Sequence, residues 1–231
     1  MARAPSNIPT VKPGAGAPPG APDCPACGEP LFVWVETAGY GPREDEIVDR
    51  CESCGLVAAR GRVPGGPEQA ASELLASARR RSADSSTVRI PNPASLQAWF
   101  GAENWAALRP GEPGLGMPPK AAGLLFERAG MRMARSRWAP AIAIASMWQT
   151  AINLLTFHRD FAVEAASGRL RPGHGKDLAA WIIDLLISVL VAAPTAIIAV
   201  VLETLSGLLG RGGVFEATVD AGRGGEPQRR P

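Results

Sequence analysis

The four cysteines of this chain fall in two close pairs, and this spacing constrains the fold more than any other feature of its 231 residues. The pairs are Cys24 with Cys27 and Cys51 with Cys54, and a glycine follows each pair directly. Two residues between paired cysteines let both sulfurs reach one tetrahedral ion, and the glycine allows a tight turn that points backbone amides at the thiolates. The pattern therefore predicts a structural zinc site with these four cysteines as its ligands.

Two other uses of the cysteines fit the sequence less well. A disulfide framework would scatter cysteines through a small secreted domain. A redox dithiol needs only one pair, and usually a thioredoxin-like surround that is not visible here. Four protein ligands leave no position for water, so the expected role is structural and not catalytic. Because residues 1–22 lack the apolar segment of a signal peptide, the metal site is expected in the cytoplasm, where thiols stay reduced.

The segment between the cysteine pairs predicts a β-hairpin. Residues 31–36 and 46–50 have the composition of strands, and residues 37–45 contain the glycine and proline of a turn. With its flanking cysteines the hairpin forms a zinc ribbon over residues 23–60. The hairpin tip (YGPREDE) has an acidic bias, and the net charge of the chain is only +2. Both observations favour a protein partner or a purely structural role over nucleic-acid binding.

A strongly apolar stretch occupies residues 178–209 near the C-terminus. Within it, residues 185–202 contain no charge, and a helix of this length reaches about 27 Å, close to the thickness of a bilayer core. The alternative is a buried helix of a soluble core, for which this short chain offers little covering protein. We therefore expect a membrane partner. Pro194 lies at the middle of the run and either kinks a spanning helix or turns a re-entrant hairpin.

The charges around the apolar stretch indicate its orientation. Arg169, Arg171 and Lys176 precede it, and only Arg211 follows closely. This asymmetry favours the cytoplasm for the N-terminal side, so we expect the cell membrane as the location, with the ribbon on its cytoplasmic side.

A second uncharged run covers residues 138–157. It carries Gln149 and Asn153, which are costly in a spanning helix without partners. We interpret it as an amphipathic or interfacial helix more readily than as a second span. The arginines that precede it (Arg128, Arg132, Arg135 and Arg137) suit anionic lipid headgroups.

Taken together, these patterns predict a small α+β protein of several parts, in which a mainly helical region follows the ribbon and ends in an apolar membrane helix or hairpin. The expected parts are a disordered start (1–22), the ribbon (23–60), a linker with a short helix (61–87), a segment of strands and helices (88–137), an amphipathic or interfacial helix and loop (138–177), the transmembrane or re-entrant segment (178–209) and a disordered tail (210–231).

Several short motifs in residues 88–137 resemble the C-terminal part of class I S-adenosylmethionine-dependent methyltransferases. The matching pieces are VRIPNPASL (88–96), FGAENW (100–105) and LLFERAGM (124–131), and the later MWQTAINLLTF (147–157) and GRGGVFE (210–216) resemble members with a membrane-seeking insert. The resemblance implies a strand that ends in Pro-Asn, a helix opened by Ser95, and a later helix that leads to the last strands. It also implies S-adenosylmethionine as a cofactor and methyl transfer as the reaction.

The chain departs from that family where the cofactor would bind. The family's cofactor site needs a Gly-rich loop after its first strand and an acidic residue after its second. Only 32 residues (55–86) separate Cys54 from Thr87, and each β-α unit needs about 30. We therefore do not expect this chain alone to bind S-adenosylmethionine. Asn92 and Ser95 occupy the loop that lies near the family's active site, and here we expect them to turn the chain and cap a helix.

No set of catalytic residues is evident elsewhere. The chain has two histidines, and His158 and Asp160, in TFHRDF, lack the serine of a catalytic triad. We expect His158 to be interfacial or solvated, and Trp99 and Trp105 to serve packing or an interface.

Three functions remain open. The first is a non-enzymatic, membrane-associated protein whose ribbon contacts other proteins. The second is a methyltransferase, or a subunit of one that a partner chain completes. The third is a ribbon that binds nucleic acid near the membrane. The missing Gly-rich loop favours the first over the second, and the nearly balanced charge favours it over the third.

Overall fold

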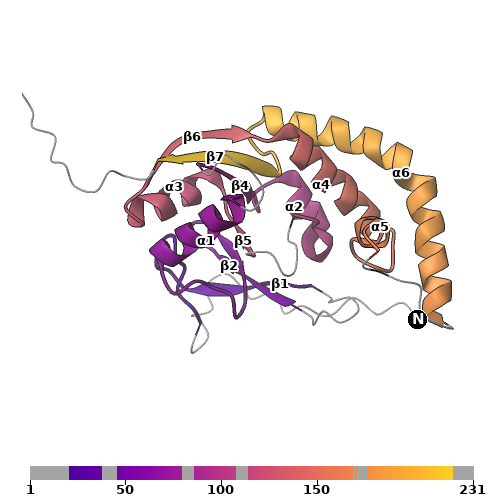
Figure 1. The fold of residues 1–231 in the computed structure, drawn as a ribbon, viewed down its shortest axis with the longest axis horizontal. Helices are drawn as coiled ribbons and strands as arrows, with labels where there is room; N and C mark the ends of the chain where they lie inside the picture. Colours follow the sequence, from indigo (N-terminus) through magenta and orange to yellow (C-terminus); the bar gives the residue numbers. More distant parts are fainter. Residues whose placement is uncertain are drawn as a thin grey trace, which may run out of the picture.

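The fold is described by a computed structural model that covers residues 21–37, 46–79, 86–107, 114–168, 170 and 176–220. Over these residues the chain is α+β, with two antiparallel sheets, six α-helices and one short 3-10 helix (Figure 1). The α+β class predicted from the sequence is confirmed. The expected disordered start lies almost wholly outside the described residues.

The first sheet contains the predicted hairpin and two further strands. Its strands are β1 (Leu31–Thr37), β2 (Glu46–Cys51), β3 (Val57–Ala59) and β5 (Leu115–Gly116), in the order β1-β2-β3-β5. Leu31 pairs with Cys51, so the base of the hairpin lies at the cysteines. The two hairpin strands agree with the sequence-based prediction. Residues 38–45, which hold most of the acidic tip, lie outside the described residues.

The second sheet joins segments that are far apart in the sequence. Its strands are β4 (Thr87–Pro91), β6 (Arg132–Trp138) and β7 (Val214–Asp220), in the order β4-β7-β6. β4 lies at the start of the segment that we expected to hold strands and helices (88–137), and β6 lies at its end. β7 is a correction, because we had assigned residues 210–231 to a disordered tail. Phe215, Ala217 and Val219 alternate into the core, and this burial at every second residue makes the segment a strand between two others.

Two helices cover the inner side of the second sheet. They are α1 (Pro67–Arg79) and α3 (Pro119–Arg128), and α3 ends just before Gly130, whose φ of 70° suits a helix end. One hydrophobic cluster holds Leu74 of α1, Phe126 of α3 and Phe215 of β7 together with Cys24 and Cys51. The cysteine region therefore packs into the same core as the second sheet.

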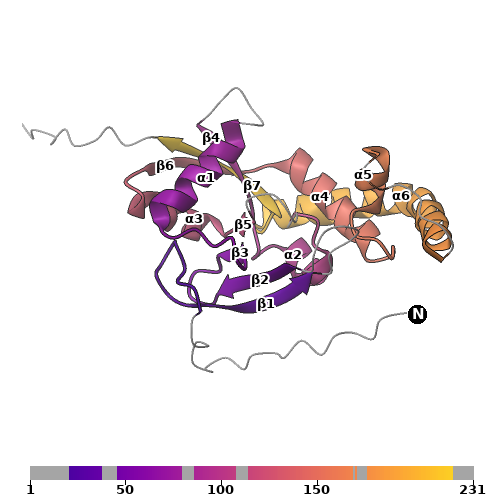
Figure 2. The same ribbon diagram turned by 60° about the horizontal axis from the view of Figure 1, so that its bottom comes forward.

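The remaining helices form a separate layer beside the sheets. They are α2 (Leu96–Gly101), the 3-10 helix η1 (Ala102–Asn104), α4 (Pro140–Asn153), α5 (Phe161–Ala166) and α6 (Lys176–Leu208). Figures 1 and 2 show α6 as the outermost element, bent around α4 and α5. Pro194 lies inside one continuous helix. The re-entrant hairpin that we had considered at Pro194 is therefore wrong, and the chain stays helical through this residue.

A glycine-rich turn after α6 leads into β7, and its Gly213 has no room for a side chain. The carbonyl of Gly213 accepts a hydrogen bond from the Asn92 amide at 2.8 Å, and a Cβ atom on Gly213 would overlap the amide group of Gln97. We expect Gly213→Ala to lower the free energy of unfolding by about 2–3 kcal/mol through overpacking. Gly123→Ala in α3 is the control, since its Cβ would meet only Met133 at 3.6 Å and alanine favours a helix. Thermal melting of the two variants checks the prediction, which fails if they melt alike.

Candidate metal centre

Each cysteine pair sits on a tight turn of the same design. The amide of Gly28 donates to the carbonyl of Cys24 at 2.8 Å, and the amide of Gly55 donates to the carbonyl of Cys51 at 2.9 Å. Both glycines have positive φ angles, 86° and 78°. A side chain there would strain the backbone, so glycine after each pair lets the chain curl around the sulfurs. The repeated turn is the reason that two short motifs far apart in sequence present sulfur in the same way.

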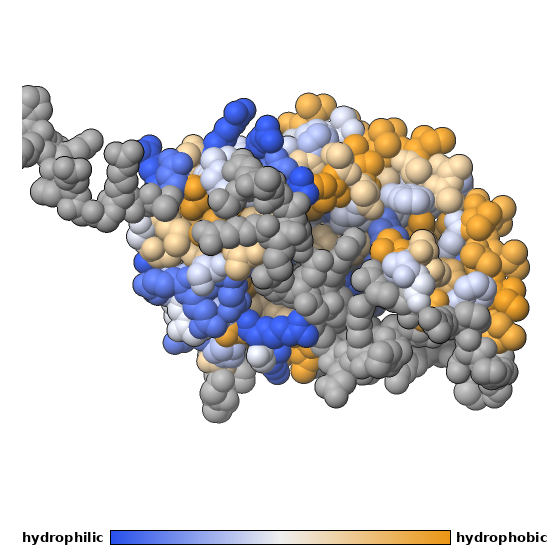
Figure 3. Space-filling model, in the orientation of Figure 1, coloured by the Kyte–Doolittle hydropathy of each residue, from blue (hydrophilic) through white to orange (hydrophobic). Residues whose placement is uncertain are grey.

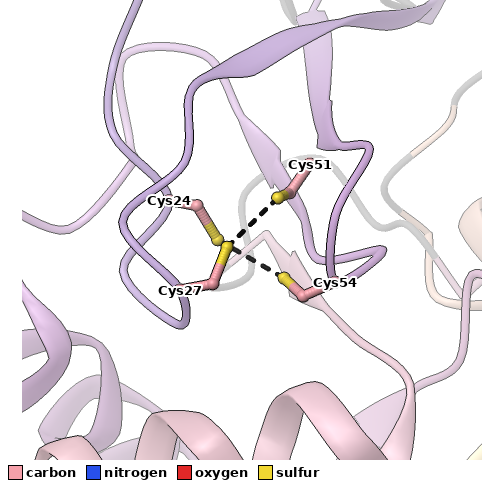
Figure 4. A group of neighbouring side chains, drawn as sticks. All are labelled: Cys24, Cys27, Cys51 and Cys54. Carbon is pink, nitrogen blue, oxygen red and sulfur yellow. Dashed lines mark hydrogen bonds between the residues drawn. The ribbon is translucent and has the colours of Figure 1, made fainter.

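The two turns bring all four sulfurs together. The Sγ atoms of Cys24, Cys27, Cys51 and Cys54 lie within 4.8 Å of one another. Cys24 and Cys54 are 3.6 Å apart, Cys27 and Cys51 are 3.4 Å apart, and no cysteine is in a disulfide (Figure 4). Tetrahedral zinc with bonds of about 2.3 Å separates its sulfurs by about 3.8 Å. The four cysteines predicted as ligands therefore form a group that could hold a metal ion such as zinc.

Burial makes this group unfavourable for negative charge unless a cation is present. Burial raises the pKa of the Cys24 thiol and raises the pKa of Cys54 to about 11. Burial also opposes ionisation of Cys51, but hydrogen bonds from the Cys54 amide and the Cys27 thiol outweigh it, and the pKa of Cys51 is lowered. Sulfur binds a metal as thiolate. A bound cation is therefore the natural way to keep the four thiolates together.

The two turns that carry the cysteines pack against helix α3. The Cγ atom of Pro118, at the start of α3, would lie 3.1 Å from a Cβ on Gly55, and the Arg128 guanidinium, at the end of α3, would lie 3.7 Å from one on Gly28. Cys24 and Cys51 are buried, with 1% and 0% of their surface exposed. A substitution in either turn should therefore disturb the packing of α3 and of the core behind it.

Asn92 and Ser95, the two residues of the methyltransferase-like loop, have structural roles. The Asn92 amide group donates to the carbonyl of Gly212 at 3.0 Å, and its side-chain oxygen accepts from the Ala94 amide at 3.1 Å. The Ser95 hydroxyl accepts from the Ala98 amide at 3.2 Å and caps α2. The expectation that Asn92 turns the chain and Ser95 caps a helix is confirmed.

His158 is buried, contrary to our expectation of an interfacial or solvated side chain. Its Nδ1 atom contacts the carboxylate of Asp184 on α6, and the backbone amides of Phe157 and His158 donate to the same carboxylate at 2.8 and 3.0 Å. Asp160 is also buried and accepts from the Asn153 amide group at 3.1 Å. The sequence could not indicate the His158 pairing, because its partner lies 26 residues away across a helix.

A second buried carboxylate, that of Glu203, ties the other half of α6 to the sheets. It accepts from the Gly213 amide at 2.6 Å, from the Trp138 indole at 3.2 Å and from the Gln97 amide group at 3.0 Å. Gln97 in turn accepts from the Trp105 indole at 3.1 Å. In the sequence, Glu203 directly follows the uncharged run of residues 185–202. A charged residue at the end of such a run was the one signal that could have pointed to this network.

One helix in the described part of the chain is long and apolar enough to cross a membrane. It covers Leu178–Leu208 of α6. Its exposed side chains are almost all large and apolar, and they include Leu186, Val189, Leu190, Ile197, Ile198, Val201, Leu205 and Leu208. Figure 3 shows this as a hydrophobic surface along α6. The run seen in the sequence is therefore one apolar helix with an exposed outward side, long enough to cross a membrane.

Comparison with known proteins found no matching family model, no similar curated protein and no similar solved structure. The function is therefore argued from two features of the chain itself, the cysteine cluster and the exposed face of α6.

Proposed function

We propose that this chain is a membrane-associated zinc-ribbon protein that acts as a non-enzymatic interaction module. The observation that carries the proposal is the exposed apolar face of α6, on which Leu190 and Leu208 keep 80% and 76% of their surface accessible. A contiguous apolar surface of this length is unfavourable in water and marks a membrane or partner site. The cell membrane is the proposed location, with the cysteine cluster on its cytoplasmic side.

Zinc is the proposed metal because the donor set consists only of cysteine. Soft thiolate ligands in a tetrahedral arrangement select zinc or an iron–sulfur centre, and paired CxxC turns on a hairpin are typical of zinc ribbons. Four protein ligands close the coordination sphere, so the ion would stabilise the fold and would not activate water. In this role the cysteine cluster holds β1 and β2 against α3.

The body of the chain is proposed to derive from a methyltransferase by loss of its cofactor half. The order of elements supports this origin, since strand β4 ends at Pro91, Ser95 opens α2, and α3 leads to β6. Strand β7 follows after α4, α5 and α6. Between Cys54 and Thr87 the described residues form only β3 and α1. The same order of elements is also compatible with the alternative function, a methyltransferase subunit that a partner chain completes.

Calorimetric titration of S-adenosylmethionine into the zinc-loaded, detergent-solubilised full-length chain separates these two functions. The non-enzymatic module should give no saturable heat, and metal analysis of the same sample should give one zinc per chain. Saturable binding of S-adenosylmethionine to the chain alone would overturn the proposal, because the chain would then contain a complete cofactor pocket. Iron in place of zinc would correct the metal and leave the membrane association standing.

A further inference from the structure

The polar side of α6 faces the protein and its apolar side faces outward, the reverse of a helix on a water-soluble surface. Six of its described side chains are buried, and all but Ala199 are polar; they are Asp184, Ser188, Thr195, Ala199, Glu203 and Ser206. The Thr195 hydroxyl accepts from the Trp148 indole of α4 at 3.1 Å. Hydrogen bonds thus hold α6 to the rest of the protein, and its large apolar side chains face outward.

Both halves of α6 are fixed to the same body. Asp184, in the N-terminal half, binds the turn after α4 at Phe157 and His158. Glu203, in the C-terminal half, binds Gln97 of α2 and the turn before β7. These two carboxylates are both fully buried, and about 28 Å of helix separates them. The rest of the protein is therefore bound along α6 over a length equal to the thickness of the bilayer core.

Behind this length of helix lie α4, then the segment around Trp105, and then strand β1 of the first sheet. α4 packs on α6, and behind α4 the Ala106 amide donates to Thr150 at 3.0 Å, while Asn153 donates to the carbonyl of Asn104 at 3.0 Å. The next residue, Trp105, packs edge-on against Trp34 of β1, with ring centroids 6.2 Å apart. Figure 1 shows the resulting order from β1 through α2 and α4 to α6.

A spanning α6 would carry these layers into the bilayer. The open edge of strand β1 would then lie at the depth of the lipid tails. Irregular loops and open sheet edges exposed to lipid do not occur there, because their backbone groups would lack hydrogen-bond partners. An α6 that lies in one face of the bilayer avoids this cost, since only its outward apolar side enters the lipid.

A basic surface continues the apolar face of α6 at one end. β6 is an edge strand with Arg132, Arg135 and Arg137 exposed, and it leads directly into α4. Glu216 of β7 binds Arg137 at 2.8 Å and Arg89 of β4 at 3.1 Å. Within the described part of the chain, Arg132 and Arg135 make no ion pair. Figure 3 shows hydrophilic residues at this end of the molecule bordering the hydrophobic surface of α6.

We propose that α6 anchors the chain on one face of an anionic bilayer, with both helix ends on the same side and with Arg132 and Arg135 on the lipid headgroups. This inference rests on the proposed membrane association and makes it specific. Arginine beside an apolar surface is the complement of a negatively charged membrane surface, because the headgroups attract the charge while the tails receive the apolar side chains.

The position of the helix ends is tested with a fluorescent label that dithionite destroys and that does not touch the cysteines. A keto-bearing amino acid carrying the fluorophore nitrobenzoxadiazole replaces Ala179 in one full-length variant and Leu209 in another, both exposed positions. After binding to vesicles, dithionite added outside should bleach both labels completely. A label that stays protected until detergent is added would show that α6 spans the bilayer and would overturn the inference.

The lipid preference is tested by flotation with vesicles of phosphatidylcholine, alone or with phosphatidylglycerol. Arg135→Gln should lower binding to the anionic vesicles about fivefold and leave binding to the neutral vesicles unchanged. Lys120→Gln is the matched control, because Lys120 is exposed on α3, on the other side of the sheet. Equal binding of the wild-type chain to both vesicles, or an equal loss in the two variants, would contradict the role of the arginines.

The two tests also separate this inference from the proposed function. Binding to vesicles with a protected label overturns only the one-face anchor. A chain that floats with neither vesicle and forms a soluble dimer through α6 overturns the membrane association itself.

Discussion

Replacing Cys51 by serine is expected to abolish the proposed zinc binding and to unfold the first sheet, β1-β2-β3-β5. Cys51 is fully buried, belongs to the hydrophobic core and pairs with Leu31 at the base of the hairpin. A serine hydroxyl is a poor zinc ligand, and the three remaining cysteines would not complete the proposed tetrahedral site. Structural zinc sites contribute about 10–16 kcal/mol of apparent binding free energy, more than the whole stability of an ordinary domain.

The Cys51→Ser effect is measured by zinc content and by thermal melting of the purified full-length chain. We expect the zinc content to fall from one equivalent to almost none and the cooperative transition to disappear. Ser53→Ala is the control, because Ser53 lies between the two ligands of the same turn and is exposed. If Cys51→Ser kept its transition, the cysteine cluster would not be structural. A strong chelator should reproduce the Cys51→Ser result in the wild-type chain.

Replacing Glu203 by alanine is expected to detach the C-terminal half of α6. The change would remove the shared acceptor of the buried Gly213 amide, the half-buried Trp138 indole and the Gln97 amide group, which keeps only the Ala143 carbonyl. Each unsatisfied buried group costs about 1–3 kcal/mol, so the free energy of unfolding should fall by about 3 kcal/mol or more. For a chain of this size, this corresponds to a melting temperature lower by roughly 10 °C.

Two further variants make the Glu203 experiment specific. Glu203→Gln keeps an acceptor for part of the network and should melt between Glu203→Ala and the wild type. Glu127→Ala removes an exposed carboxylate from α3 and should melt within about 1 °C of the wild type. Equal melting of Glu203→Ala and Glu127→Ala would show that the network does not hold α6.

Local patterns in the sequence were sufficient to predict the cysteine cluster. Each pair of cysteines lies within a single turn, Cys24 with Cys27 and Cys51 with Cys54, so its spacing is a local signal. The strands of the hairpin between the pairs follow from their composition. Ser95 was also predictable, because a helix cap depends on residues only three positions apart. That the metal is zinc and that the fold is a ribbon remain proposals.

Features that depend on distant partners could not be predicted in this way. β7 follows a glycine-rich turn and precedes a polar end, and it becomes a strand only because β4 and β6 lie on both sides of it. The long apolar run indicated a membrane helix, but its sequence did not reveal which side faces the protein. The inward positions of Asp184 and Glu203 depend on α4, α2 and the turn before β7, which no local pattern contains.

Flotation of the zinc-loaded, full-length chain with lipid vesicles tests the membrane association most directly. The comparison uses Leu190→Glu, on the most exposed part of α6, and Leu124→Glu, the same change at an exposed apolar position of α3. We predict that the wild type and Leu124→Glu float with the vesicles, and that binding of Leu190→Glu is at least about tenfold weaker. A wild-type chain that stays in the soluble fraction, or a Leu190→Glu chain that floats as well as the wild type, would contradict it.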